Sequence, residues 1–393
     1  MTDTRIVPLP EPGDVLLEPP SAEEVAVMVG AFKTACAPAG GITDVQRAVI
    51  TAITESMTGI TADVDAVAPV TAGEFAEAMR RRDAGFRTRM VQMMLLGELL
   101  LVPLPPDVTA RVEDYATRLG VADDMMAVAR RVANGSLGLA LIDFERSGYF
   151  GHLLETPPEH LHTAQPLQDA WQLAYHDPVL QARWAALEEC PEGSLGRGVW
   201  QFYRARGFTF PGTPNSAPPT LAQHDWIHVL ADYGSTVESE IEVFGLISRA
   251  NDDPRAFSLL AMVLGLFETG YLYGAARGFF GYDRGHLSRD ADRMARRLAD
   301  AMYRGAKLAW HLNDIGRPDD TDLLATDWFD YADRHVDDVR EELGLLPKSE
   351  RAITCGSVGP WDTGGISPFQ FAQGQRAAEA EGREYQSYGA SPA

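Results

Sequence analysis

Two histidines stand four residues apart in the segment Leu221–Tyr233, which reads LAQHDWIHVLADY. On an α-helix, residues with this spacing lie one above the other on the same face, with Cβ atoms roughly 5–6 Å apart. A helix here brings the imidazoles of His224 and His228 within reach of one cation, and Asp225 borders the same face. The spacing therefore predicts a helix that carries three potential ligands along one side.

A second helix is predicted directly after the first. Gly234 is a residue type that ends helices, and Ser235 and Glu238 have the spacing of a capping box, which commits Glu238 to the backbone amide of Ser235. Glu240 lies deeper in this second helix. A tight turn between antiparallel helices would bring Glu240 back towards His224.

The hairpin would bring together two imidazoles and two carboxylates, those of His224, Asp225, His228 and Glu240. We expect these four residues to be the metal ligands and the catalytic residues. Such a set suits Zn²⁺, the ion we expect, and is compatible with Fe²⁺ or Mn²⁺. Two other interpretations stay open. The histidines could be solvated side chains on a polar helix face. HDxxH could also be a variant of the zinc-peptidase motif HExxH, in which the middle carboxylate is the general base.

Composition restricts the partners and the compartment. The net charge of −22 repels phosphate backbones, so we expect no nucleic-acid binding. The three cysteines, Cys36, Cys190 and Cys355, are far apart and form no CxxC pair, which fits a reducing, cytoplasmic environment. No basic and apolar signal segment is recognisable at the N-terminus.

One stretch, Phe257–Phe280, is apolar and long enough to span a bilayer. It contains Glu268 near its centre, Arg277 near its end and several glycines. Charged side chains are costly inside a membrane, so we expect a buried core helix and no transmembrane segment.

Helical periodicity, without two-residue alternation over any useful length, predicts an all-α chain with two helical domains. The length of 393 residues also favours two domains. The first helix should begin at the capping box of Ser21 and Glu24. The predicted parts are an extended N-terminal arm (1–20), an N-terminal helical domain (21–145), a linker (146–165), a metal-binding domain (166–347) and a loosely ordered C-terminal tail (348–393) with a short helix at Gln373–Glu384.

The metal-site motif, HDxxH followed after eleven residues by Glu240, resembles the hallmark of the coenzyme Q biosynthesis protein 4 family. Asp232 stands where that family has a glycine, and residues 21–145 lie outside its usual chain and look faintly similar to TerB-type helical domains. Further similar segments lie within about residues 166–347: Glu192–Arg197, Phe202–Gly207, Leu230–Gly234, Val237–Ala250, Ala301–Lys307, Asp327-Trp328 and Val339–Gly344.

The resemblance implies a helical bundle with a metal-binding helical hairpin and an apolar channel for isoprenoid lipids. It implies a metalloprotein of quinone-type biosynthesis, carrying out metal-dependent oxidative decarboxylation and hydroxylation of a prenylated aromatic ring. Two alternatives are an isoprenoid-lipid-binding scaffold for other biosynthetic proteins, with a structural metal, and a repurposed enzyme of the same family that acts on another aromatic metabolite.

A polyprenyl tail needs an oily lining near the metal. Arg204 and Arg206 could pair with a carboxylate or phosphate head group, or be solvated surface arginines. An apolar surface near such a channel would favour a homodimer and peripheral contact with a membrane. The apolar stretch supplies the candidate lipid-binding residues, for each of which ordinary core packing is the alternative: Leu259, Met262, Leu266, Tyr271 and Phe279.

Overall fold

The computed structural model describes residues 20–137, 140, 147–149, 161, 176–214, 216–271 and 284–393. Across these ranges the secondary structure is helical and contains no β-strand, so the all-α prediction is confirmed. The predicted N-terminal arm lies outside the described residues apart from Pro20. The predicted linker also lies outside them, apart from residues 147–149 and 161.

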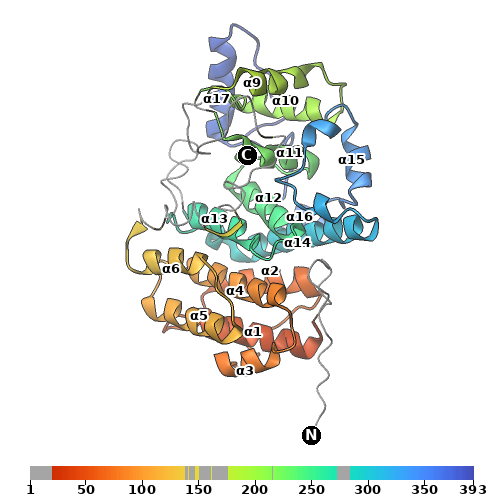
Figure 1. Ribbon diagram of the computed structural model, residues 1–393. Helices are drawn as coiled ribbons and strands as arrows, with labels where there is room; N and C mark the ends of the chain where they lie inside the picture. Colours follow the sequence, from red (N-terminus) through yellow and green to blue (C-terminus); the bar gives the residue numbers. More distant parts are fainter. Residues whose placement is uncertain are drawn as a thin grey trace.

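The N-terminal helices form a layer at the bottom of Figure 1. The capping box predicted for the first helix is present, because Ser21 Oγ accepts the Glu24 amide and the Glu24 carboxylate accepts the Ser21 amide. The rings of Phe32, Phe75 and Tyr115 meet in the core of this layer. Its helices are α1 (Ala22–Cys36), α2 (Asp44–Thr58), α3 (Ala72–Ala78), α4 (Ala84–Leu99), α5 (Pro106–Leu119) and α6 (Met125–Ala133).

The second region contains the predicted hairpin, formed by α11 (Pro219–Leu230) and α12 (Val237–Ala250). The longest helix, α14 (Ala291–Asp314), packs along α12 and gives the hairpin a rigid support. The remaining helices are α9 (Pro178–Ala185), α10 (Leu195–Arg206), α13 (Phe257–Phe267), α15 (Val336–Glu342), α16 (Glu350–Thr354) and α17 (Pro368–Ala380), with short 3₁₀ helices at Ala186–Glu189, Ser288–Asp290, Pro318–Thr321 and Trp328–Tyr331.

The two regions pack directly against each other. Helix α2 lies on α14, and α4 lies on α13 (Figure 1). The buried Arg89 on α4 donates to the carbonyl oxygens of Asn251 and Asp252, each at 2.9 Å. Buried apolar side chains of both regions form one continuous cluster. The N-terminal layer therefore supports the helices against which the hairpin packs.

The apolar stretch 257–280 is not one helix. Helix α13 ends at Phe267, because Glu268 turns towards a neighbouring loop and its carboxylate accepts the amides of Leu287 (2.9 Å) and Ser288 (3.2 Å). Residues 272–283 lie outside the described part of the chain. Among the helices that are described, none has both the length and the apolar character needed to cross a bilayer.

The prediction of a loosely ordered tail was wrong. Helix α17 packs on α10, where Gln373 Nε2 donates to the Gly207 carbonyl (3.0 Å) and the Tyr385 hydroxyl donates to the Ala205 carbonyl (2.9 Å). This segment is held largely by hydrogen bonds and close backbone contacts. Its polar, glycine-rich composition therefore resembles that of a disordered chain, although it folds back onto the second region.

Candidate metal centre

The turn between α11 and α12 differs from the predicted one. Asp232, with φ of 59°, takes the left-handed conformation that we expected of Gly234. Helix α12 begins after Thr236 without a side-chain cap. Glu238 does not cap Ser235, because its carboxylate instead accepts a hydrogen bond from His286 Nδ1 at 2.8 Å. A tertiary partner has therefore replaced the predicted local cap.

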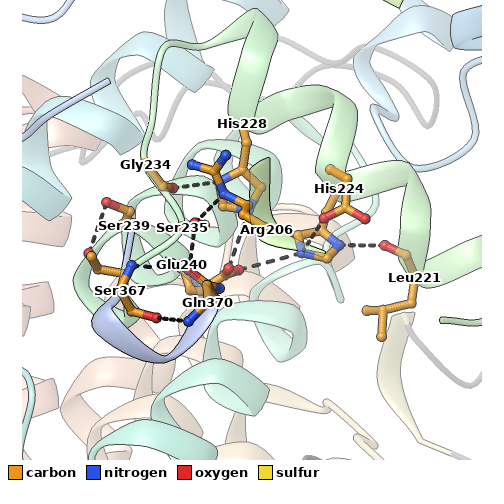
Figure 2. Close-up of polar contacts among 12 residues, drawn as sticks. Arg206, Leu221, His224, His228, Gly234, Ser235, Ser239, Glu240, Ser367 and Gln370 are labelled. Atoms are coloured by element: carbon orange, nitrogen blue, oxygen red, sulfur yellow. Dashed lines mark hydrogen bonds and ion pairs between the residues drawn. The ribbon is translucent and has the colours of Figure 1, made fainter. Parts of the chain in front are cut away.

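The hairpin nevertheless brings the four predicted ligands together. Figure 2 shows His224 and His228 on α11 facing Glu240 on α12. The Nε2 atoms of His224 and His228 lie 3.5 Å and 3.3 Å from the two Glu240 carboxylate oxygens. Asp225 Oδ1 is 3.5 Å from His224 Nε2. The ligand atoms of His224, Asp225 and His228 all lie within 4.8 Å of one another.

Both imidazoles are oriented by backbone carbonyls. His224 Nδ1 contacts the Leu221 carbonyl oxygen, and His228 Nδ1 lies 2.7 Å from that of Gly234. A carbonyl oxygen only accepts, so each Nδ1 carries a proton and each Nε2 faces the cluster. Metal-binding histidines characteristically donate their other ring nitrogen in this way.

His228 Nε2 is the strongest sign of a ligand site. The His228 side chain is 0% exposed, and among the described residues its Nε2 makes no hydrogen bond that meets normal geometry, only the 3.3 Å contact with Glu240. A buried nitrogen that is so weakly satisfied is well placed to bind a cation. His224, at 14% exposed, is the most accessible of the four side chains.

Burial and the neighbouring charges shift the pKa values of His224 and Glu240. Burial disfavours the charged imidazole, but the carboxylates of Asp225 and Glu240 outweigh it and raise the pKa of His224 to about 9. Burial also opposes ionisation of Glu240, yet His228 and His224 hold the pKa of its carboxyl well below the usual range. His224 therefore favours its protonated form, and a metal ion bound through its Nε2 would displace that proton.

Sequence reasoning missed Tyr203 on α10. Its hydroxyl donates to Asp225 Oδ2 at 2.5 Å, so Oδ1 is the oxygen of Asp225 that faces His224. Burial, followed by the Asp225 charge, raises the pKa of Tyr203 well above its usual value and keeps the hydroxyl protonated as a donor. The sequence offered only an indirect signal. Tyr203 lies in the segment Phe202–Gly207, one of the segments that resemble the coenzyme Q biosynthesis protein 4 family.

Aromatic rings enclose the two imidazoles. Phe202 stacks on His228 with ring centroids 5.2 Å apart, and Phe244 lies 5.2 Å from His224. These rings shield one side of each imidazole from solvent. Charges and dipoles interact more strongly in such a low-dielectric environment than at the surface.

The structure contradicts the prediction that Arg206 binds a ligand head group. Arg206 is 0% exposed, and its guanidinium donates to Ser235 Oγ (2.5 Å) and to the carbonyls of Pro360 (3.0 Å) and Gly365 (2.9 Å). Arg204 forms an ion pair with Glu381. The sequence could not reveal these partners, because most of them lie in the C-terminal segment that we expected to be loose.

The predicted lipid-binding residues belong to the surroundings of α13, which packs on α12 and α4. Leu259 and Met262 are buried in the continuous core, which agrees with ordinary core packing, and Leu266 is half-buried. The half-buried Tyr271 donates its hydroxyl to the Leu101 carbonyl. Phe279 lies outside the described residues, so a lipid channel in this region stays a prediction.

A cleft of about 520 Å³ lies elsewhere, between α2 and the start of α14. Charged side chains dominate its rim, including Arg47, Glu55, Asp290 and Arg351. None of the predicted ligand-binding residues lines it.

Comparison of the chain with protein-family models, with curated proteins and with solved structures gives no match. The geometry of the hairpin and the resemblance in its motif are therefore what point to a function.

Proposed function

We propose that His224, Asp225, His228 and Glu240 bind one divalent cation, with zinc as the first candidate and Fe²⁺ or Mn²⁺ as alternatives. The observation that carries this proposal is the buried Nε2 of His228, which, within the described part of the chain, makes no hydrogen bond of normal geometry and faces the Glu240 carboxylate at 3.3 Å. Two imidazoles and two carboxylates match the ligand preferences of these ions.

We further propose that the chain is a metal-dependent enzyme that oxidatively decarboxylates a prenylated aromatic acid. The ring carboxyl would leave as CO₂, a hydroxyl would take its place, and the two electrons would pass to an external oxidant such as dioxygen. The motif's resemblance to the coenzyme Q biosynthesis protein 4 family supports this choice of substrate. When bound, the cation would act as a Lewis acid towards a phenolic or carboxylate oxygen. Tyr203 holds Asp225 in place, and the rings of Phe202 and Phe244 keep the imidazoles away from bulk water.

A second candidate, supported by the burial of the cluster, is a structural cation in an isoprenoid-lipid-binding scaffold. All four side chains are at most 14% exposed, and structural sites are typically closed, whereas catalytic sites keep an open position. A further alternative is an enzyme that acts on another aromatic metabolite. We also propose that the chain can form a homodimer and contact a membrane peripherally.

Elemental analysis of the purified chain and a prenylated hydroxybenzoate turnover assay test the proposal. His228→Ala should abolish metal binding. If this variant stays folded but loses turnover, the cation is catalytic, and if it unfolds, the cation is structural. Absence of any stoichiometric metal in the wild-type chain, even after incubation with Zn²⁺, Fe²⁺ or Mn²⁺, would overturn the metal-site proposal.

A further inference from the structure

The turn of the metal hairpin is held by a segment far along the chain, residues 357–370. The Gly234 amide donates to the Val358 carbonyl at 2.9 Å, and the Ser235 amide donates to the Gly365 carbonyl at 3.0 Å. Ser235 Oγ donates to Gln370 Oε1 at 2.8 Å. Backbone and side chain of the turn are therefore both tied to this segment.

The close approach of two glycines allows these bonds to form. A Cβ atom at Gly234 would lie 2.8 Å from both the Cα and the carbonyl oxygen of Gly365, closer than real Cβ contacts come. The backbones of the turn and the C-terminal segment are thus in direct contact, without side chains between them. Any shift of the segment would be transmitted to the turn.

Arg206 joins the same contact from α10. Its Nε donates to Ser235 Oγ at 2.5 Å, while its Nη2 donates to the Gly365 carbonyl at 2.9 Å. Its guanidinium carbon also lies 3.7 Å from the centroid of the Phe202 ring, which in turn stacks on the His228 imidazole. Figure 2 shows Arg206, Ser235 and Gln370 close to one another near Gly234.

These contacts converge on His228 by two routes. The first runs through the turn, because the Gly234 carbonyl accepts the proton on His228 Nδ1 at 2.7 Å. The second runs through Phe202, whose ring contacts both the His228 ring and the guanidinium of Arg206. A partner that orients a ligand imidazole alters metal affinity without touching the metal.

We infer that residues 357–370 are a positioning segment of the metal centre, and that Arg206, Ser235 and Gln370 are the positioning residues that couple it to His228. The inference rests on the proposed metal binding. It assigns a role in cation affinity to a part of the chain that contributes no ligand. A purely structural role would lower the stability of the chain but leave cation affinity unchanged.

The test is the affinity of the full-length protein for Zn²⁺, measured by competition with a chelating indicator. Ser235→Ala removes the acceptor of Arg206 Nε and the donor to Gln370. Gln370→Met removes the same contact from the other side. Both should weaken Zn²⁺ binding by about tenfold, the lower end of the effect of losing a residue that bonds a ligand directly, because Ser235 and Gln370 act on His228 through Gly234. Ser235→Thr keeps the hydroxyl and should restore affinity.

Ser21→Ala is the matched control. The Ser21 hydroxyl caps α1 by accepting the Glu24 amide at 3.2 Å, and it lies outside the positioning segment, in the N-terminal layer. This variant should lower the melting temperature yet bind Zn²⁺ like the wild type. If Ser21→Ala weakens binding as much as Gln370→Met, general loss of stability is the cause and the inference fails.

The remaining outcomes distinguish failure of the positioning role from failure of the proposed metal site. If wild type and His228→Ala bind Zn²⁺ equally weakly, the metal site itself is refuted. If His228→Ala loses Zn²⁺ while Ser235→Ala and Gln370→Met keep wild-type affinity, only the positioning role is refuted. If Ser235→Ala does not fold, Gln370→Met decides between these results.

Discussion

The imidazole of His228 donates from Nδ1 to the carbonyl oxygen of Gly234, six residues further along the chain, at 2.7 Å. This one bond fixes both the tautomer and the direction of the ring, so that Nε2 faces Glu240. The turn that follows α11 is therefore part of the candidate site. Its conformation, as much as the ligand residues themselves, determines whether a cation can bind.

The bond between Tyr203 and Asp225 predicts an effect on metal affinity. Tyr203→Phe should weaken Zn²⁺ binding about tenfold, because Asp225 Oδ2 loses its donor and the carboxylate is less well oriented. Tyr115→Phe is the control, since the Tyr115 hydroxyl donates to the Val70 carbonyl within the N-terminal layer. Equal Zn²⁺ affinities in the two variants, measured by competition titration, would argue against a role for Tyr203.

The contact between Gly234 and Gly365 predicts opposite effects of alanine at two glycines. Gly234→Ala should destabilise the protein by about 1–3 kcal/mol, because its Cβ would meet backbone that must move away. Gly73 lies in a helix, and the atom nearest to a new Cβ there would be 3.8 Å away. Gly73→Ala should therefore stabilise the protein by about 0.4–1 kcal/mol. Urea unfolding measures both changes, and a neutral Gly234→Ala would contradict the packing described.

The left-handed conformation of Asp232 predicts a difference between two substitutions. Lys348 Nζ binds the Asp232 carboxylate at 2.9 Å and its carbonyl at 2.6 Å, and both Asp232→Asn and Asp232→Ala lose the ion pair. Only alanine also carries the left-handed penalty, which asparagine largely avoids, so Asp232→Ala should be less stable by about 1 kcal/mol. Chemical denaturation of the two variants side by side tests this, and equal stabilities would contradict it.

Glu98 predicts a loss of stability at alkaline pH. It is 0% exposed, neither carboxylate oxygen has a hydrogen-bond partner among the described residues, and burial raises its pKa to about 8 from 4.5. The folded state therefore holds this proton more tightly than the unfolded state. The contribution of Glu98 to the free energy of unfolding should be fully present below pH 4.5. It should be lost as the pH rises to about 8, which lowers the stability by a few kcal/mol in order of magnitude.

Glu98→Gln is the matched variant for this effect, because it mimics the neutral acid and does not titrate. The free energy of unfolding of this variant should depend less on pH between 5 and 8, with a gain over the wild type that grows with pH. Identical pH profiles for the two proteins would show that Glu98 is not the responsible group.

Local signals predicted much of the fold and of the site. The capping box of Ser21 and Glu24 marked the start of α1, and the spacing of His224 and His228 predicted the helix that carries them. Local signals gave the wrong partner for a side chain where a residue far along the chain bound it instead. Glu238 had the spacing of a cap, but His286 binds its carboxylate, and Thr236 precedes the helix instead.

The sequence by itself determined the helical hairpin and the convergence of its four polar side chains. Residues a few positions apart have their geometry set by the helix and a short turn. Only the tertiary structure decided what surrounds them. Ser235 and Gln370 are 135 residues apart, and no local pattern encodes their meeting. The path of the whole chain brings them together, and it buries Arg206 against Ser235 instead of leaving it free for a ligand.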